Sequence, residues 1–218
     1  MSGASESSTM NLEQNAEKGP ELTAFRRELR NRLIAGREAM PPARRAEAET
    51  ALEIHLENLL AHLKPQVFAF CWPFRGEFDA RALVVRLLAA GPRALLPVVV
   101  EKGAAMLFRE WTPDAPMLLD RYGIPVPAEG PQGVPELLLM PVNGFDAAGF
   151  RLGYGGGYFD RTLASLSPRP VAVGVGFELA RVETIRPQAF DERLDYLVTE
   201  AGAFAVTDAG LESVGGRR

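Results

Sequence analysis

The sequence predicts an α/β protein, a three-layer α/β/α sandwich around a mostly parallel, Rossmann-like central sheet. Two observations predict this fold. Short apolar runs at 67–70, 94–99, 137–140 and 171–175 have the length and composition of buried strands. Stretches with the apolar spacing of helices, at 80–88 and 158–166, separate several of these runs. Such alternation produces parallel strands with crossover helices. Proteins of this fold bind their ligands beyond the carboxyl ends of the strands.

Two helices are expected before the first strand. The first helix begins at Glu21 and continues until Met40 and the following proline pair stop it, with one apolar face formed by Leu22, Phe25, Leu29 and Leu33. The second continues to Leu63, before Pro65, with an apolar stripe of Leu52, Leu56, Leu59 and Leu63. A last strand is expected at 196–199.

The composition predicts one domain between two tails. Residues 1–20 are rich in Ser, Glu and Asn, so we expect a disordered N-terminal tail there. Residues 21–206 supply the apolar content of a single α/β domain, whereas 207–218 are thin in apolar residues and read as a C-terminal tail.

Charge and cysteine content narrow the class of partner. A net charge of -4 and an isoelectric point near 5.4 argue against strong non-specific attraction to nucleic acid or to an anionic membrane surface. No run approaches the roughly 20 apolar residues of a membrane span, and the N-terminus lacks the order of a signal peptide. Cys71 is the only cysteine, so an internal disulfide and a structural zinc site are unsupported. These features predict a cytoplasmic protein that acts on small molecules.

A glycine-rich segment between a predicted strand and a predicted helix carries the strongest chemical signal. Four glycines lie within the five positions 153–157, so the backbone can adopt positive φ and bring N–H groups to phosphate oxygens. The following helix adds its positive N-terminal end. Arg151 precedes this loop and can neutralise phosphate charge, and Asp160 follows it and can hold a magnesium ion.

Glycines alone leave this interpretation open. The segment is neither GxxxxGK[ST] nor GxGxxG, which disfavours an ordinary P-loop NTPase or a dinucleotide-dependent dehydrogenase. A tight connection with no ligand would also account for a run of glycines.

The complete string is far more specific. The segment GFDAAGFRLGYGGGYFDRTL resembles the pattern F-D-x-x-G-x-R-L-G-x-G-x-G-[YF]-[YF]-D of the 5-formyltetrahydrofolate cyclo-ligase family. Weaker matches flank it in the right order: WPFRGEFD at 72–79, LPVV at 96–99, YGIP at 122–125, and the stretch 191–200. The resemblance spans roughly residues 25–200.

The resemblance implies the ATP site residue by residue. Basic residues of the family's first helix, in a K-x-x-L-R arrangement, correspond to Arg26 and Arg30, which lie one helical turn apart. For either arginine alone, a solvated helix face is a competing interpretation. The implied ATP-binding residues are Arg26, Arg30, Arg151, Leu152, Gly153, Tyr154, Gly155, Gly156, Gly157 and Tyr158, with Arg151, Tyr158 and Asp160 as the catalytic set.

The resemblance also implies the folate site and a magnesium site. Glu77 matches the family glutamate that contacts folate, and Trp72 adds a flat apolar surface. Alternatively, Trp72 is part of the core, and Glu77 caps the helix near Asp79 or pairs with Arg75. Asp160 and Asp191 are the implied magnesium ligands, although Asp191 also suits a loop or cap role.

The implied reaction is the ATP-dependent cyclisation of 5-formyltetrahydrofolate to 5,10-methenyltetrahydrofolate, with release of ADP and phosphate. The chain departs from the family pattern at three positions: Arg26 stands for a lysine, Val126 for an acidic residue and Phe190 for a histidine. Two other functions therefore stay open, a diverged non-catalytic nucleotide-binding paralogue and a related α/β enzyme that handles sugar phosphates or coenzyme A. The sequence does not separate a monomer from a homodimer.

Overall fold

The computed structural model describes residues 5–214, with side-chain environments from residue 19 onward. The helices are α1 (Ser5–Glu38), α2 (Pro42–Leu63), α3 (Arg81–Leu88), α4 (Tyr158–Ser165) and the short 3-10 helix η1 (Glu178–Ala180). The strands are β1 (Val67–Ala69), β2 (Arg93–Val98), β3 (Leu107–Trp111), β4 (Met117–Leu119), β5 (Pro125–Pro127), β6 (Leu137–Pro141), β7 (Gly144–Phe145), β8 (Arg151–Leu152), β9 (Val171–Val175), β10 (Tyr196–Thr199), β11 (Gly202–Thr207) and β12 (Gly210–Ser213).

One eight-stranded sheet forms the middle of the molecule, in the order β12-β11-β10-β9-β6-β1-β2-β3. The five central strands, from β10 to β2, pair in parallel, as the sequence predicts. The strands at both edges run antiparallel to their neighbours. These antiparallel edges were not predicted, because hairpin strands leave no helix-strand alternation to recognise.

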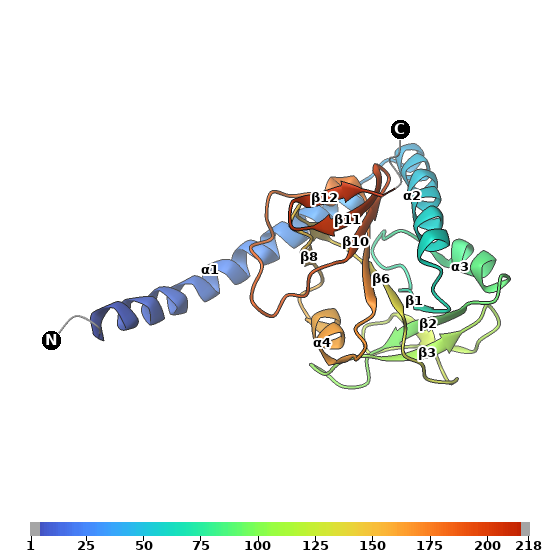
Figure 1. The fold of residues 1–218 in the computed structure, drawn as a ribbon, viewed down its shortest axis with the longest axis horizontal. Coiled ribbons are helices and arrows are strands. Elements are labelled where there is room, and N and C mark those ends of the chain that lie inside the picture. Colours follow the sequence, from blue (N-terminus) through green and yellow to red (C-terminus); the bar gives the residue numbers. More distant parts are fainter. Residues whose placement is uncertain (1–4, 215–218) are drawn as a thin grey trace.

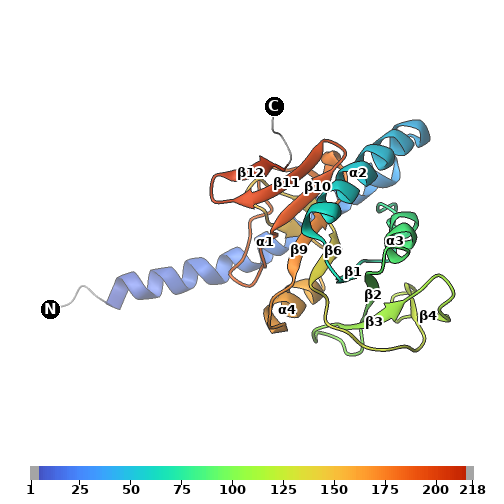
Figure 2. The ribbon, with the colours of Figure 1, turned by 45° about the vertical axis from the view of Figure 1, so that its right-hand side comes forward.

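Helices cover both faces of this sheet, which confirms the three-layer sandwich (Figure 2). Successive residues of β6 show the arrangement. Leu137 and Leu139 belong to the core cluster formed with α2 and α3, whereas Leu138 and Met140 belong to the cluster on the other face with α4. Because side chains alternate along a strand, an apolar run such as β6 fills two separate cores.

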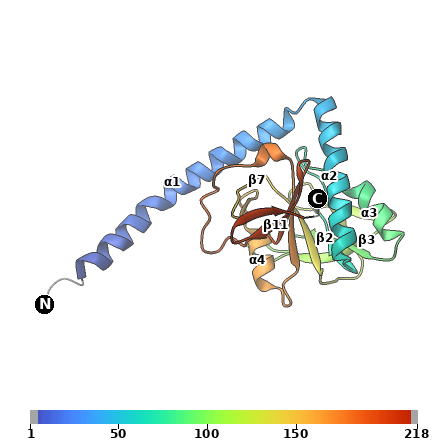
Figure 3. The same ribbon diagram turned by 45° about the horizontal axis from the view of Figure 1, so that its top comes forward.

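The first two helices meet at a sharp bend (Figure 3). Leu52, Leu56 and Leu59 of the predicted α2 stripe are buried and Leu63 is partly buried, and the helix ends at Lys64 in a left-handed conformation, φ 50°. The helix predicted from Glu21 begins earlier, at Ser5, and its N-terminal part projects away from the body of the molecule (Figure 1). The boundary between a tail and the domain near residue 20 stays a prediction.

The C-terminal boundary differs from the one expected. The sequence predicts a tail at 207–218, but β12 pairs antiparallel with β11, with Val206 opposite Leu211. The usual sequence signal for a two-residue hairpin connection is Asn-Gly or Asp-Gly. The connection here is Asp208-Ala209, so that signal is absent. The ordered domain therefore extends to Ser213.

The C-terminal half of α1 is fixed against the start of the glycine-rich loop. Leu29 and Leu33 pack with Leu152 and Ile185 in a small separate core. A Cβ added to Gly144 of β7 would lie 2.8 Å from Leu33 Cδ1, so glycine permits this close approach. This packing brings the arginines of α1 to the loop. Among the described residues, none of the helices combines the length and the apolar character needed to cross a bilayer.

Candidate functional site

A large cavity of about 640 Å³ lies beyond the carboxyl ends of β1, β2 and β6, where the α/β layout predicts a ligand. Its walls come from the glycine-rich loop, from α1 and from the segment between β4 and β5. All residues proposed for the site from the sequence line this single cavity: Arg26, Arg30, Trp72, Glu77, Arg151, Leu152, Gly153, Tyr154, Gly155, Gly156, Gly157, Tyr158, Asp160 and Asp191. The structure therefore brings together segments far apart in the sequence.

The glycine loop uses its conformational freedom at two positions. Gly155 has φ of +92° and Gly157 has φ of +63°, whereas Gly153 and Gly156 do not adopt positive φ. Gly157 is the N-cap of α4, so the loop leads directly into the positive end of that helix. At Gly156 the constraint is space, since an added Cβ would lie 2.8 Å from the ring of Tyr158.

Arg30 lies over this loop rather than on a solvated helix face. Its Nε donates to the Gly153 carbonyl at 2.6 Å, and a Cβ added to Gly155 would be 3.3 Å from its Nη2. Burial lowers the pKa of Arg30, and the charge of Arg26 acts in the same direction. An anion bound at the loop would relieve both effects.

Arg26 and Asp191 form an ion pair at one side of the cavity, with Nη2 and Oδ2 2.7 Å apart. The same carboxylate oxygen accepts a hydrogen bond from the Gln188 backbone N–H at 2.6 Å. Asp191 therefore closes a turn, as the alternative interpretation predicts, while also holding Arg26. The Nε of Arg26 is buried and has no hydrogen-bond partner among the described residues.

Arg151 and Asp160 form a second ion pair, 3.1 Å from Nη1 to Oδ1. Arg151 also donates to the Glu192 carbonyl at 3.1 Å, and Asp160 accepts the Glu192 backbone N–H at the same distance. The Arg151 side chain is only 3% exposed, yet its Nε has no partner within the described part of the chain. Buried donors normally find an acceptor, so the unpartnered Nε of Arg151, like that of Arg26, fits a ligand rich in acceptor oxygens.

Glu77 lies in the wall of the cavity, 8% exposed, with both carboxylate oxygens engaged. Oε2 accepts the Phe74 backbone N–H at 3.0 Å, and Oε1 accepts the Tyr154 hydroxyl at 2.8 Å. Burial raises the pKa of Glu77, while Tyr154 and Arg37 oppose that rise. The two structural alternatives for Glu77 are wrong, because Arg75 pairs with Glu38 and Asp79 itself accepts the first N–H of α3.

Arg37 is a site residue that the sequence did not reveal. It is 4% exposed and donates to the Asn143 side chain at 2.9 Å and to the Tyr154 hydroxyl at 3.1 Å. Its Nη2 is 3.9 Å from Glu77. In a helix rich in arginine and glutamate, the sequence pattern does not distinguish this buried cation from its solvated neighbours.

Aromatic rings line the end of the cavity near Glu77. Trp72 is half-buried, packs edge-on against Trp111 and has the Arg81 guanidinium 4.5 Å above its ring. It therefore belongs to the core and to the cavity wall at once. Phe74 meets Tyr154 edge-on, with ring centroids 5.7 Å apart.

Two exposed aromatic residues, which the sequence did not assign to the site, also line the cavity. Tyr122 places its hydroxyl 2.6 Å from that of Tyr158. Phe190, one of the three departures from the family pattern, lines the cavity and is 71% exposed. Val126, another departure, is buried in β5 and does not line the cavity.

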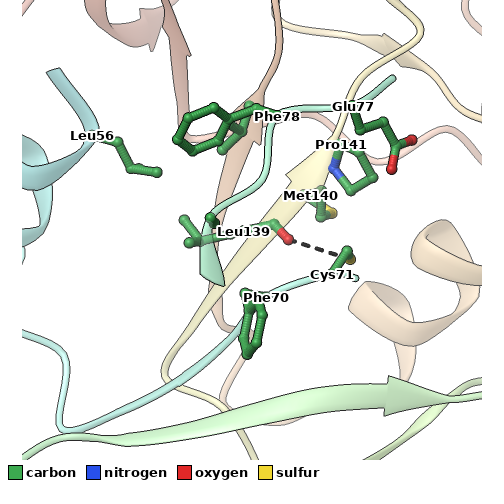
Figure 4. Close-up of a pocket in the computed structure, with 10 residues that line it drawn as sticks. Leu56, Phe70, Cys71, Glu77, Phe78, Leu139, Met140 and Pro141 are labelled. Atoms are coloured by element: carbon green, nitrogen blue, oxygen red, sulfur yellow. Dashed lines mark hydrogen bonds between the residues drawn. The ribbon is translucent and has the colours of Figure 1, made fainter. Parts of the chain in front are cut away.

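A second, much smaller cavity of about 20 Å³ lies behind Glu77 (Figure 4). Its lining is mostly apolar, and the Cys71 thiol donates to the Leu139 carbonyl at 3.6 Å beside it. Burial raises the pKa of Cys71 well above its usual value, which disfavours the reactive thiolate form. The space suits a single water at most.

The described residues contain no group of three or more His, Cys, Asp or Glu side chains placed to hold a metal ion. The predicted magnesium ligands, Asp160 and Asp191, are each held by an arginine. A cation here would need oxygen ligands from a bound phosphate as well, which is how magnesium is usually bound with nucleotides.

Comparisons with known proteins agree with this geometry. A profile described as the 5-formyltetrahydrofolate cyclo-ligase family matches residues 22–200. The 5-formyltetrahydrofolate cyclo-ligase of Haemophilus influenzae is 29% identical over 184 residues, covering 81% of this chain and 98% of that protein. The Escherichia coli K12 protein of the same name is 30% identical over 174 residues, covering 75% and 93%.

Solved structures give the same result. The 5,10-methenyltetrahydrofolate synthetase of Aquifex aeolicus superposes with a TM-score of 0.73 at 27% identity, covering 89% of this chain and all of that one. A synthetase of the same name from Mycoplasma pneumoniae, 19% identical with a TM-score of 0.65, shares the fold. Together with the profile match over most of its length, these similarities show that the chain belongs to the 5-formyltetrahydrofolate cyclo-ligase family.

Proposed function

We propose that this protein catalyses the ATP-dependent cyclisation of 5-formyltetrahydrofolate to 5,10-methenyltetrahydrofolate, with release of ADP and phosphate. One observation carries the proposal: a single cavity of about 640 Å³ is lined both by a glycine loop with arginines and by aromatic rings with a carboxylate. A volume in this range holds ligands of drug size. Two substrates that must react with each other need such a shared space.

The ATP phosphates would bind at the glycine loop. The loop's N–H groups, the N-terminus of α4 and the side chains of Arg26, Arg30 and Arg151 all favour negative charge there. The buried Nε–H groups of Arg26 and Arg151 would gain the acceptors that they lack among the described residues.

The folate would bind beside Glu77, with its pterin ring between aromatic side chains. Trp72 and Phe74 offer flat apolar surface, and Glu77 offers acceptors to the N–H donors of the pterin edge. Each Glu77 oxygen makes one hydrogen bond within the protein, so further acceptor capacity is left for a ligand.

In the proposed reaction the formyl oxygen attacks the γ-phosphorus of ATP, a bond to that oxygen forms, and the bond to the ADP oxygen breaks. The formyl carbon becomes electrophilic, the neighbouring side-arm nitrogen attacks it and loses its proton, and the oxygen leaves as phosphate. No step needs a protein nucleophile. The protein's part is to align the substrates and to neutralise the charge on the transferred group.

We place magnesium with the phosphates, next to Asp160 and Asp191. The Oδ2 of Asp160 and the Oδ1 of Asp191 lie outside the ion pairs with arginine, so each carboxylate keeps one oxygen for a cation. Magnesium supplies charge neutralisation to the phosphates when bound. We further propose that the enzyme works in the cytoplasm on small molecules, as a monomer or homodimer; the single cysteine, which remains a free thiol, fits a reducing compartment.

Folate-dependent ADP release tests this function. We expect ADP to form from MgATP only when 5-formyltetrahydrofolate is present. Nucleotide binding without turnover would indicate a non-catalytic paralogue. ADP release that does not depend on folate would contradict the proposed coupling of the two substrates.

A further inference from the structure

Tyr154 belongs to the glycine loop through its backbone, although the family pattern leaves this position open. The carbonyl of the preceding residue, Gly153, accepts a hydrogen bond from Arg30 Nε at 2.6 Å. The residue after it, Gly155, is held at φ +92°. A ligand that binds the backbone of this loop would therefore also fix the position of the Tyr154 backbone.

The side chain of Tyr154 extends from the loop to Glu77, a residue from a different part of the cavity lining. Its hydroxyl donates to Glu77 Oε1 at 2.8 Å and lies 3.1 Å from Arg37 Nη2. A guanidinium can only donate and a carboxylate can only accept, so the direction of this chain is fixed from Arg37 through Tyr154 to Glu77. The ring also packs edge-on against Phe74 at 5.7 Å.

Arg37 gives the chain a rigid end. It is 4% exposed and also donates to the Arg75 carbonyl at 3.1 Å and to Asn143 Oδ1 at 2.9 Å. Because these bonds fix the guanidinium, a shift of the loop at Tyr154 would break the bonds to Arg37 and to Glu77 together. The position of the loop and the orientation of Glu77 are therefore linked.

We propose that Tyr154 is a positioning residue that couples the glycine loop to Glu77, so that nucleotide at the loop and folate at Glu77 strengthen each other's binding through its hydroxyl. This inference rests on the proposed function, because it needs both ligands. A ligand that fixes the loop lowers the conformational entropy that is lost when the second ligand binds. Each ligand therefore raises the affinity of the other by the same factor.

The charge of Glu77 supports the same role. Burial raises the pKa of Glu77, and the hydrogen bond from Tyr154 acts against that rise. A loop displaced from this position would leave a buried carboxylate with one hydrogen bond fewer, and a carboxylate in that state is less able to accept from a pterin.

The cavity offers a matched control. Tyr122 lines the same cavity, and its hydroxyl lies 2.6 Å from that of Tyr158. Tyr122→Phe removes a hydroxyl from the cavity without touching Glu77, whereas Tyr154→Phe removes the linking hydroxyl and keeps the ring on Phe74.

The test measures the dissociation constant of 5-formyltetrahydrofolate with and without a saturating non-hydrolysable ATP analogue and magnesium. In wild type we expect the analogue to tighten folate binding roughly five- to 150-fold, and folate to tighten analogue binding by the same factor. In Tyr154→Phe this ratio should fall close to one, while Tyr122→Phe keeps the wild-type ratio. Hydrogen exchange adds a second readout: folate alone should slow exchange of the amides at 153–157 in wild type and not in Tyr154→Phe.

Two results would overturn the coupling alone: a wild-type ratio of one with both ligands bound, or an undiminished ratio in Tyr154→Phe. A merely structural role would lower the melting temperature of Tyr154→Phe and leave the ratio as in wild type. Failure of the proposed function looks different, since wild type would then not bind the folate or the nucleotide at all, and the coupling would fall with it.

Discussion

Replacing Glu77 by glutamine removes its charge and keeps its shape, which separates a substrate contact from a structural cap. Two donors face this carboxylate, the Phe74 backbone N–H at 3.0 Å and the Tyr154 hydroxyl at 2.8 Å. A glutamine has a single acceptor oxygen, which can stay on the fixed N–H. The Tyr154 hydroxyl can rotate and accept from the glutamine amide instead. The local structure should therefore survive Glu77→Gln.

The stability of this variant follows from the raised pKa of Glu77. Burial disfavours the carboxylate more than its partners favour it, so the native pKa lies above the ordinary value of 4.5. The stability that Glu77 contributes is therefore fully present below its unfolded pKa and is lost as pH rises through its native pKa. Glutamine does not titrate. The free energy of unfolding of Glu77→Gln, relative to wild type, should rise across that window and then stay level, so the melting temperature of the variant relative to wild type should be higher at pH 8 than at pH 5.

Ligand binding should change in the opposite sense. A charge-assisted hydrogen bond contributes about 1.5–3 kcal/mol, so its loss should weaken 5-formyltetrahydrofolate binding roughly ten- to a hundredfold. Binding of ATP, measured alone, should change less than about twofold, because the glycine loop keeps its arginines.

Calorimetry with each ligand and thermal unfolding at pH 5 and pH 8 measure both effects. Glu53→Gln is the matched control, since it breaks an ion pair at the surface, 2.6 Å from Arg86, and neither residue lines the cavity. We expect unchanged ligand binding there and a stability change within about 1 kcal/mol. Wild-type folate affinity in Glu77→Gln, together with a lower melting temperature, would refute the reasoning and leave Glu77 as a cap for the Phe74 turn.

Three further substitutions test the ATP end of the cavity. Arg151→Lys keeps the charge but loses the buried Nε–H, so the KM for ATP should rise about tenfold with the folate KM unchanged. Wild-type KM values for both substrates in this variant would remove Arg151 from the site. Gly155→Ala forces a side chain onto φ +92° and towards Arg30, so thermal unfolding should show a loss of about 1–2 kcal/mol, and calorimetry weaker ATP binding. Gly91→Ala, at φ +110° with open space around it, should share the stability loss and bind ATP normally, and equal ATP affinities in both variants would exclude the loop. Asp160→Asn should raise the magnesium concentration for half-maximal turnover severalfold, and an identical magnesium titration would exclude Asp160 as a ligand.

The buried parallel strands and their helices were predictable because apolar runs and helical spacing report burial directly. The run at 137–140 is β6, and the helix predicted at 158–166 is α4. The edge strands were not predictable in the same way. The segment Leu107–Trp111 is only partly buried and contains the charged residues Arg109 and Glu110, so it lacks the continuous apolar run of a central strand.

At the site, the sequence predicted which residues gather but not what they do to one another. The motif pointed to Tyr154 as part of a phosphate loop, and its backbone is there, but its hydroxyl lies on Glu77. That contact depends on the tertiary placement of a loop more than seventy residues away, as does the burial of Arg37. The ion pairs that hold Asp160 and Asp191 are likewise visible only in the folded chain.

The central claim is that this cavity joins ATP cleavage to ring closure on a formylated folate. The most direct measurement is the ultraviolet absorbance of 5,10-methenyltetrahydrofolate after the purified protein is mixed with MgATP and 5-formyltetrahydrofolate. The account predicts a rise that needs all three components and that matches the ADP released one for one. A mixture that binds both substrates yet gives no such absorbance, or ADP without it, would contradict the claim.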